Sequence, residues 1–370
     1  MIAEKDMRNA AARIISAIKN TPAQESSALF GFDACIDTVV SVVRQRLGDN
    51  SSEYFGHTGE FGDFLRQLGD RSCGLELKTK VSRPGGNMVI TANALGRLGI
   101  KADCIGTFGY PDIVPVFRNI SPNCSLYSVA ETITATALEF DVSKIIMFDP
   151  GPYNDLNWDT LVKVIGMNKL KQLASGKKLI SFLNWSEIEN SSAIWTSFLV
   201  EIFQEIHADM KITFFTDLSD CSRKSGDEIK GVAEILKMLK KHFRVILSLN
   251  VNESIIVAGA LGIQSGSSDE IFMREMRSAC NVDVLLLHRI KDALACDEKE
   301  IIGFDTFFSG DPKILTGGGD NFNAGYCFSV YFDMSLSDSL VLANAVAGFY
   351  VREGHSPDKE ELLSFLRKIL

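Results

Sequence analysis

The sharpest chemical signal in the sequence is the segment TGGGDNFNAGY at residues 316–326, in which three consecutive glycines precede Asp320. Three glycines allow a tight turn whose backbone amides all point at one anion. The residues after Asp320 are compatible with a helix, so the turn belongs at a helix N-terminus, where the helix dipole also favours negative charge. We therefore expect Gly317, Gly318 and Gly319 to form an anion hole.

Asp320 would open this helix beside the anion hole. A carboxylate there can take the proton of an attacking hydroxyl while the amides stabilise negative charge on a phosphoryl group in transfer. The alternative is that Asp320 only caps the helix and the glycines only form a loop, without chemistry. The segment is not a Walker A loop, because no Gly-Lys-Ser/Thr follows the glycines.

Three further segments carry polar side chains at the ends of apolar runs. GFDACID at 31–37 ends the first apolar run, RPGGN at 83–87 precedes a helical segment, and NVNE at 250–253 follows the apolar run 245–249. Taken singly, each has a plain structural interpretation: a turn aspartate, a glycine turn that feeds a helix, and a helix cap at Asn252. Their meaning therefore depends on whether one fold brings them together.

Short apolar runs alternate with helical segments over most of the chain. The apolar runs predict strands at 28–32, 102–108, 178–183, 211–216, 245–249 and 282–287. Helical spacing is clear at 87–98 and 229–241. Buried strands separated by helices predict a three-layer α/β/α fold, Rossmann-like, with a mostly parallel sheet covered on both faces.

Two segments break this alternation. Residues 38–82 follow the first strand without a clear βα repeat, and residues 130–148 are rich in β-branched and aromatic types. Both predict antiparallel strands that leave the main sheet and form a small discontinuous β lid, which would exclude water from a reaction. The α/β core then comprises approximately residues 1–37, 83–129 and 149–370.

Composition limits the partners of the chain. It has 370 residues, 46% hydrophobic and 23% charged, with a net charge of −9, which argues against nucleic acid or an anionic membrane as a partner. Its eight cysteines include no CxxC pair and its five histidines do not cluster, so a Cys/His metal site is not expected. The first twenty residues do not resemble a signal peptide, and no apolar run reaches the roughly 20 residues of a membrane span. We expect a cytoplasmic protein.

The four segments together resemble the ribokinase-like (PfkB) carbohydrate kinases, in the order of that family and across residues 31–326. The glycine segment is similar to the C-terminal signature Gly-x-Gly-Asp. RPGGN, with ANALGRLG at 92–99, is similar to the N-terminal signature, and NVNE is similar to the family motif Asn-x-x-Glu. Each motif alone is common, so the resemblance depends on their occurrence together.

The resemblance implies a kinase that transfers the terminal phosphoryl group of a nucleotide to a hydroxyl of a small sugar or nucleoside, with Asp320 as catalytic base. Carboxylates suit such acceptors because one carboxylate accepts hydrogen bonds from two neighbouring hydroxyls. The substrate-binding residues that the resemblance implies are Asp37, Gly85, Gly86 and Asn87, with Asp33 as a weaker candidate.

The resemblance also implies Mg²⁺ and a nucleotide co-substrate near Asn250 and Glu253, with Glu253 holding the metal directly or through water. His288 and Arg289 end the predicted strand 282–287, close to the expected nucleotide. A histidine at this position is similar to the ADP-dependent branch of the superfamily, whereas the glycine segment favours the ATP branch. We expect ATP ahead of ADP. His288 as a core residue and Arg289 as a solvated charge remain the plainer interpretations.

Other classes of function stay open. A non-catalytic sugar or nucleotide sensor is compatible with the same fold, although binding alone does not require Asp320. An NAD-dependent oxidoreductase fits less well, because no Gly-x-Gly-x-x-Gly follows the first strand. The resemblance also allows a homodimer. The sequence does not identify the acceptor sugar.

Overall fold

A computed structural model of the chain describes residues 4–20, 27–141, 143–205, 212–264, 266, 268–314 and 316–369. The described residues form a 9-stranded main sheet and a separate 5-stranded sheet. In spatial order, the main sheet consists of β14 (Ile301–Asp305), β13 (Asp292–Cys296), β12 (Val284–His288), β11 (Arg244–Asn250), β10 (Thr213–Asp217), β9 (Leu179–Phe182), β1 (Ala28–Phe32), β5 (Ala102–Gly106) and β6 (Cys124–Ser128).

The main sheet is parallel from β12 to β6, and β13 is antiparallel to both of its neighbours. The six strands predicted from apolar runs are present, which confirms the mostly parallel sheet. The predicted strand 211–216 begins at Lys211, which lies outside the described residues. The hairpin of β13 and β14 at one edge was not among the predicted strands.

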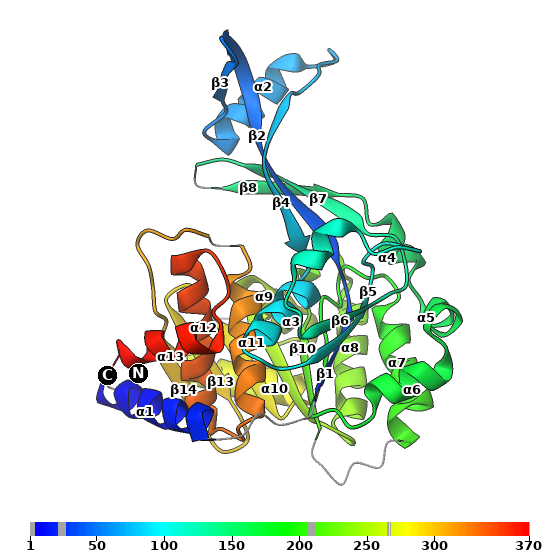
Figure 1. Cartoon of the computed structure of the whole chain (residues 1–370), viewed down its shortest axis with the longest axis vertical. Coiled ribbons are helices and arrows are strands. Elements are labelled where there is room, and N and C mark those ends of the chain that lie inside the picture. The colour runs from blue at the N-terminus through cyan, green and yellow to red at the C-terminus, as the bar shows by residue number, and fades with distance from the viewer. Residues whose placement is uncertain are drawn as a thin grey trace.

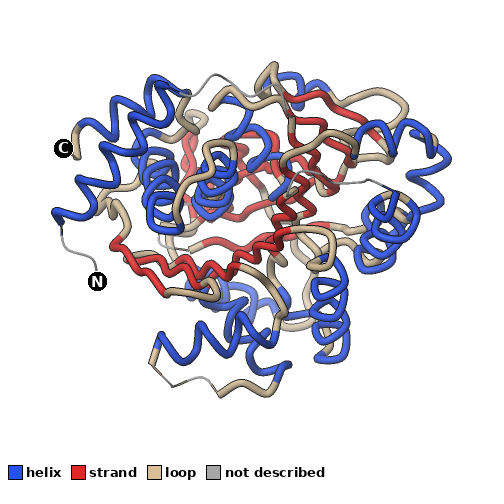
Figure 2. Tube along the Cα trace, turned by 90° about the horizontal axis from the view of Figure 1, so that it is seen from below, coloured by secondary structure: helices blue, strands red, loops and turns tan. Residues whose placement is uncertain are grey.

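Helices cover both faces of the main sheet, because successive strand residues point into two different cores. Leu285 belongs to one core and Leu286 to the other. One helical layer contains α5 (Trp158–Ile165), α6 (Met167–Ala174), α7 (Ser191–Glu201), α8 (Gly226–Leu239), α9 (Val251–Leu261) and α10 (Asp269–Ala279). The other contains α1 (Glu4–Asn20), α3 (Asn87–Arg97), α11 (Gly318–Val330), α12 (Leu336–Glu353) and α13 (Lys359–Arg367). Figure 2 shows the strands between these helices, so the predicted three-layer α/β/α fold is confirmed.

The second sheet is built from the two segments that interrupt the βα alternation. It contains β3 (Ser51–Tyr54), β2 (Cys35–Gly48), β7 (Ile133–Glu139) and β8 (Lys144–Phe148), with β4 (Leu77–Gly85) also paired to β2. One face packs on α2 (Thr58–Leu68) through a small apolar cluster that includes Val40, Phe61 and Leu138. Figure 1 shows this sheet projecting from one edge of the main core.

That edge is the carboxyl end of the parallel strands. Asp33 follows β1, Asn184 lies just after β9, and Asp217, Asn250 and His288 are the last residues of β10, β11 and β12. Because parallel strands all end at the same edge, these polar side chains are brought together, and ligands of α/β proteins bind at such edges. A short helix, α4 (Gly151–Asp155), and three 3₁₀ turns, Pro115–Asn119, Phe203–Glu205 and Cys221–Arg223, complete the described elements. None of the described helices combines the length and apolar character that a membrane crossing needs.

Candidate active site

The glycine turn forms the N-terminus of α11, which begins at Gly318. Gly317 caps the helix with a φ of 94°, a left-handed conformation that favours glycine. The turn is held from two sides, because the Tyr350 hydroxyl donates to the Thr316 carbonyl at 2.7 Å and Asn321 Nδ2 donates to the Gly317 carbonyl at 2.8 Å. The first N–H groups of an α-helix have no partner within the helix, so this fixed turn presents amide donors to an anion.

Asp320 lies in the first turn of α11 and remains partly accessible to solvent. Burial of its carboxyl raises its pKa well above the usual range, and the charges of Asp217, Asp33 and Asp37 raise it further. The opposing influence is a backbone hydrogen bond rather than a nearby cation. Asp320 is therefore a strongly basic carboxylate once it is ionised, and it lies beside the amides of the glycine turn.

Asp33 is fully buried, with an exposed fraction of 0%. Its Oδ1 accepts from the Met88 amide and its Oδ2 accepts from Asn184 Nδ2, both at 3.0 Å. Gly86, with a φ of 97°, packs so closely that a Cβ there would lie 2.8 Å from Asp33 Oδ2. Burial raises the pKa of Asp33 to about 6. The structure thus places Asp33 beneath the glycine pair, with both oxygens engaged by the protein.

Asp37 lies on β2, opposite Arg83 on β4. Its carboxyl packs on Gly85, where a Cβ would lie 2.4 Å from Asp37 Cγ. Cys35 Sγ is 3.5 Å from Asp37 Oδ1. Burial raises the pKa of Asp37, and the Arg83 charge opposes this effect. Asn87, the first residue of α3, is partly accessible and its side chain makes no hydrogen bond with a described residue. Asp37 and Asn87 therefore both retain capacity for a ligand.

The strand β8 connects the second sheet to the core at both of its ends. At one end, Lys144 Nζ donates to the Thr316 hydroxyl, next to the glycine turn. Burial lowers the pKa of Lys144, and the nearby Asp37 charge opposes this shift. At the other end, the Arg223 guanidinium lies 5.1 Å from the centre of the Phe148 ring. The sequence did not single out Lys144, because the contact joins residues 172 positions apart.

Asp217 and Asn184 are two further polar groups of the site that the sequence did not indicate. Asp217 is buried, and its Oδ2 accepts from Asn323 Nδ2 at 2.8 Å while its Oδ1 accepts from the Ser219 amide at 2.9 Å. The Oδ1 atoms of Asn184 and Asn323 are buried without a partner among the described residues. The available sequence signal was the position of Asp217 and Asn184 at the ends of apolar runs.

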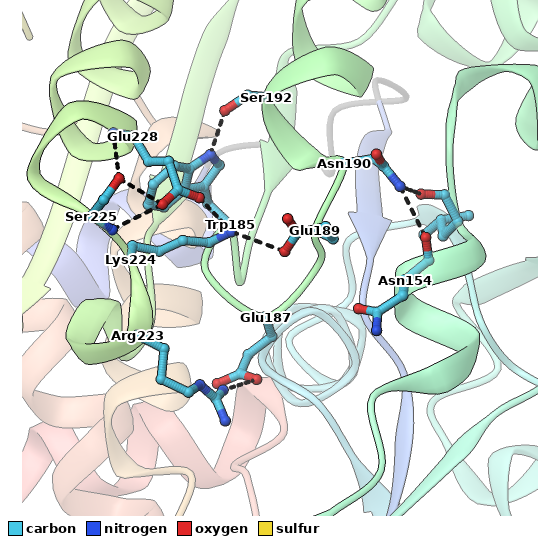
Figure 3. Close-up of polar contacts among 11 residues, drawn as sticks. Asn154, Trp185, Glu187, Glu189, Asn190, Ser192, Arg223, Lys224, Ser225 and Glu228 are labelled. Carbon is cyan, nitrogen blue, oxygen red and sulfur yellow. Dashed lines mark hydrogen bonds and ion pairs between the residues drawn. The ribbon is translucent and has the colours of Figure 1, made fainter.

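The loops that carry Asn184 and Asp217 are braced against each other (Figure 3). Arg223 forms an ion pair with Glu187, and Lys224 lies 3.5 Å from Glu189 and 5.4 Å from the centre of the Trp185 ring. The bracing extends to the neighbouring helices through the hydrogen bond of Trp185 Nε1 to Ser192, the bonds of Asn190 to the carbonyls of Asn154 and Leu156, and the capping box of Ser225 with Glu228. This side of the site is therefore preorganised.

A cavity of about 390 Å³ opens on the other side of the glycine turn. It is lined by both polar and apolar residues, including Asn250, His288, Arg289, Phe308, Gly318, Gly319, Ala347 and Val351. His288 contacts the turn closely, since a Cβ on Gly319 would lie 3.0 Å from His288 Cε1. Burial lowers the pKa of His288, and its Nε2 has no partner among the described residues. Arg289 forms ion pairs with Asp269 at 2.7 Å and Asp292 at 3.3 Å.

Asn250 and Glu253 form the capping box that starts α9. The Asn250 amide donates to Glu253 Oε2 at 2.8 Å, and the Glu253 amide donates to Asn250 Oδ1 at 2.9 Å. Asn250 Nδ2 lies 2.6 Å from Glu253 Oε1. Burial raises the pKa of Glu253 to about 9, with further contributions from the charges of Asp217 and Asp320. Glu253 thus both caps α9 and lies beside the carboxylates of Asp217 and Asp320.

The arrangement fits a magnesium ion that a nucleotide brings with it. No group of three or more His, Cys, Asp or Glu in the described part of the chain has the geometry to hold a metal ion alone. Oxygen donors suited to Mg²⁺ are nevertheless present in Asp217, Asn250 and Glu253, and burial and the charges of Asp217 and Asp320 raise the pKa of Glu253 while only a backbone hydrogen bond from Asn250 opposes them. Because both oxygens of Glu253 already accept hydrogen bonds, contact through water fits better than direct ligation.

Comparison with known proteins supplies the family context. A family model described as prokaryotic ketohexokinase matches residues 5–369. A curated relative, ketohexokinase of Haloferax volcanii, is 27% identical over 342 residues, which cover 91% of this chain and 90% of the relative.

Solved structures of low sequence identity share the fold. Ribokinase of Arabidopsis thaliana, complexed with ribose and ATP, has a TM-score of 0.63 at 14% identity, covering 93% of this chain and 99% of its own. An Escherichia coli protein described as ribokinase II, in complex with ATP and Mg²⁺, has a TM-score of 0.62 at 13% identity, with the same coverage. These likenesses agree with the ribokinase-like fold expected from the four motifs.

Proposed function

The chain belongs to the prokaryotic ketohexokinase family and is a sugar kinase, and we propose that it transfers the terminal phosphoryl group of ATP to a hydroxyl of a ketohexose. The observation that carries this proposal is the position of Asp320. Asp320, whose carboxyl has a raised pKa, lies in the first turn of α11, beside the N-terminal amides of that helix and near the Asp37 carboxylate.

The acceptor would lie between Asp37 and Asp320, on the side of the glycine pair that faces the second sheet. Asp37 and Asn87 would bind its hydroxyls. Because Gly85 and Gly86 have no side chain, the acceptor could approach their backbone closely. Asp33 would act beneath them as an anchor for the turn rather than as a direct contact, because the protein already engages both of its oxygens.

In the transfer step, Asp320 would take the proton of the acceptor hydroxyl as that oxygen attacks the terminal phosphorus. The new O–P bond forms while the bond from phosphorus to the leaving diphosphate oxygen breaks. The amides at Gly317, Gly318 and Gly319 would stabilise the charge on the phosphoryl oxygens, and Lys144 would add a positive charge from β8. Each of these groups is held in place before substrate arrives, which lowers the cost of reorganisation.

The nucleotide would occupy the cavity on the opposite side of the turn. Its phosphates would lie toward Gly318 and Gly319, with His288 beneath, and its base would lie toward Phe308 and Val351. Bound Mg²⁺ supplies positive charge that offsets the phosphates, and Asn250, Glu253 and Asp217 would hold it through water. ATP is the proposed donor because the glycine segment resembles the ATP-using branch.

The second sheet would act as a lid over the acceptor, formed by segments 38–82 and 130–148. The supporting observation is that the contacts of β8 with Thr316 and Arg223 both join the sheet to the core beside the site. A lid of this kind excludes water, so the phosphoryl group is transferred to the sugar rather than hydrolysed.

A matrix of donors and acceptors with Mg²⁺ tests the proposal. ATP and ADP would be crossed with ketohexoses, aldohexoses, ribose and nucleosides, and phosphorylated product would be measured for each pair. We expect the highest kcat/KM for ATP with a ketohexose, at least tenfold above any aldohexose. Preference for another acceptor would overturn the ketohexose assignment, and turnover with ADP alone would overturn the donor assignment.

A further inference from the structure

A further cavity, of about 540 Å³, lies against β4 and α3. It is bounded by the end of β4, one face of α3, the loop after Pro115–Asn119 and the connection from α12 to α13. None of the residues assigned above to the acceptor, the nucleotide or the proton lines it. It is therefore separate from the reaction site.

The side chains of this cavity suit an anion of moderate size. Arg83, Arg97 and His355 line it, against a single lining carboxylate, Asp358, whose Oδ1 accepts the Glu361 amide at the start of α13. Arg83 makes no hydrogen bond or ion pair with a described residue. Because its neighbouring carboxylate, Asp37, acts on it through charge and not through a direct bond, the Arg83 guanidinium keeps its donors available for a phosphate group, which guanidinium groups bind through two parallel bonds.

Two of the basic groups are already held in position. Arg97 Nε donates to the Ser356 carbonyl at 2.6 Å, and its Nη2 lies 3.4 Å from Glu361 Oε2. His355 Nε2 lies 3.1 Å from Glu361 Oε1. Glu361 thus neutralises part of the charge of Arg97 and holds its guanidinium in place, while Val89, Ile90 and Ile120 add apolar surface to the lining. Basic and apolar side chains in one cavity suit a phosphate monoester that carries a carbon skeleton.

Three residues of this cavity also lie next to residues of the reaction site. Tyr350 donates to the Thr316 carbonyl at 2.7 Å, and Ile90 Cγ2 lies 3.5 Å from the position of a Cβ on Gly317. Arg83 lies opposite Asp37 in the strand register. A ligand that draws Arg83 toward itself removes positive charge from beside Asp37, which weakens the acceptor site.

We propose that the cavity bounded by Arg83, Arg97 and His355 binds a small phosphate monoester of sugar-phosphate size and that its occupation weakens binding of the acceptor. The phosphate lies at the arginines and the carbon skeleton lies on Ile90. The binding step does not depend on which sugar the enzyme phosphorylates.

Binding is tested by calorimetric titration with fructose 1-phosphate, and separately with inorganic phosphate, into the full chain saturated with a non-hydrolysable ATP analogue and a ketohexose. Because these fill the reaction site, binding that remains reports a second site, and its affinity should be lower than without the ketohexose by the same factor that the sugar phosphate adds to the acceptor Kd, since the coupling is reciprocal. We expect Arg97→Gln to weaken it at least tenfold and Arg118→Gln, on an exposed residue that does not line the cavity, to leave it unchanged. Equal affinity for inorganic phosphate would overturn the assignment of the carbon skeleton to Ile90, because the phosphate group alone would then account for binding.

The kinetic arm measures the acceptor KM with and without the sugar phosphate. We expect KM to rise at least threefold in the wild type and to stay constant in Arg97→Gln. An equal rise in both proteins would mean ordinary competition at the reaction site and would overturn the proposal, as would the absence of residual binding. If Arg97→Gln does not fold, Asn119→Asp places a negative charge at the exposed rim without breaking a hydrogen bond and is expected to weaken binding at least tenfold. Failure of ketohexose turnover with intact binding would contradict only the proposed acceptor.

Discussion

Substitution of Gly85 by alanine isolates the position of the Asp37 carboxyl from every other feature of the site. Gly85 does not have the left-handed φ that requires glycine, so alanine introduces no backbone strain of that kind. The added Cβ would instead lie 2.4 Å from Asp37 Cγ and Oδ1, and 2.9 Å from Oδ2. The perturbation is therefore one methyl group directed at one carboxylate.

The size of the effect follows from these distances. Non-bonded carbon atoms approach to about 3.5 Å, so the Asp37 carboxyl must retreat by roughly 1 Å. A misplacement of about 1 Å in a positioning group costs on the order of 100-fold in rate, equivalent to about 2.7 kcal/mol. We expect kcat/KM for the acceptor to fall by about 100-fold in Gly85→Ala. Overpacking of this kind also lowers the free energy of unfolding by about 1–3 kcal/mol.

The assay is steady-state kinetics with varied acceptor at saturating nucleotide, together with nucleotide titration and thermal unfolding. Nucleotide affinity should stay within about twofold of the wild type, because Gly85 does not line the nucleotide cavity. Gly62→Ala is the matched control, since nothing lies within 4 Å of a Cβ there and alanine favours its helix. If folded Gly85→Ala retains kcat/KM within about threefold, Asp37 does not bind the acceptor.

Three further perturbations address the charges of the site. Asp217→Asn removes the neighbouring charge that most raises the pKa of Asp320, so that pKa falls and the acid limb of kcat/KM moves to lower pH; an unmoved limb in a pH–rate profile would contradict this coupling. Lys144→Gln should lower kcat at least tenfold, a loss no larger than the usual effect of removing one electrostatic group. Lys80→Gln is the control and should not lower kcat, because Lys80 forms an ion pair with Glu139 within the same sheet. Glu253 has a pKa raised from 4.5 to about 9, so the folded protein binds a proton that the unfolded chain releases, and its stability declines as pH rises across that window. Glu253→Gln should flatten this decline in thermal unfolding. If the stability of wild type and variant declines equally with pH, the raised pKa of Glu253 is refuted.

The sequence predicted best those features that are contiguous in the chain. The glycine turn and Asp320 form one segment, and the buried parallel strands appear as uninterrupted apolar runs, because strands covered on both faces have no polar side. The family resemblance placed Asn250 and His288 near the nucleotide, and the parallel topology explains why both lie at the same edge of the sheet.

Features that depend on contacts between distant segments were missed. Asp217 ends a strand without any neighbouring glycine, and its place in the site becomes apparent only when α11 brings Asn323 against it. Lys144 lies in a short strand of the second sheet, and its contact with Thr316 depends on how that sheet stands on the core. The hairpin of β13 and β14 was also missed; β13 begins at Asp292, and β14 contains Gly303 and ends at Asp305.

The central claim is that Asp320 is the catalytic base, and the most direct test is the kinetics of Asp320→Asn with parallel nucleotide titration. Asparagine keeps the size and polarity of the side chain but cannot take the proton. General-base catalysis contributes about 10²–10⁴-fold, so we predict a fall in kcat within that range, with nucleotide affinity unchanged. A kcat within about threefold of the wild type, in a variant that still binds nucleotide, would contradict the claim.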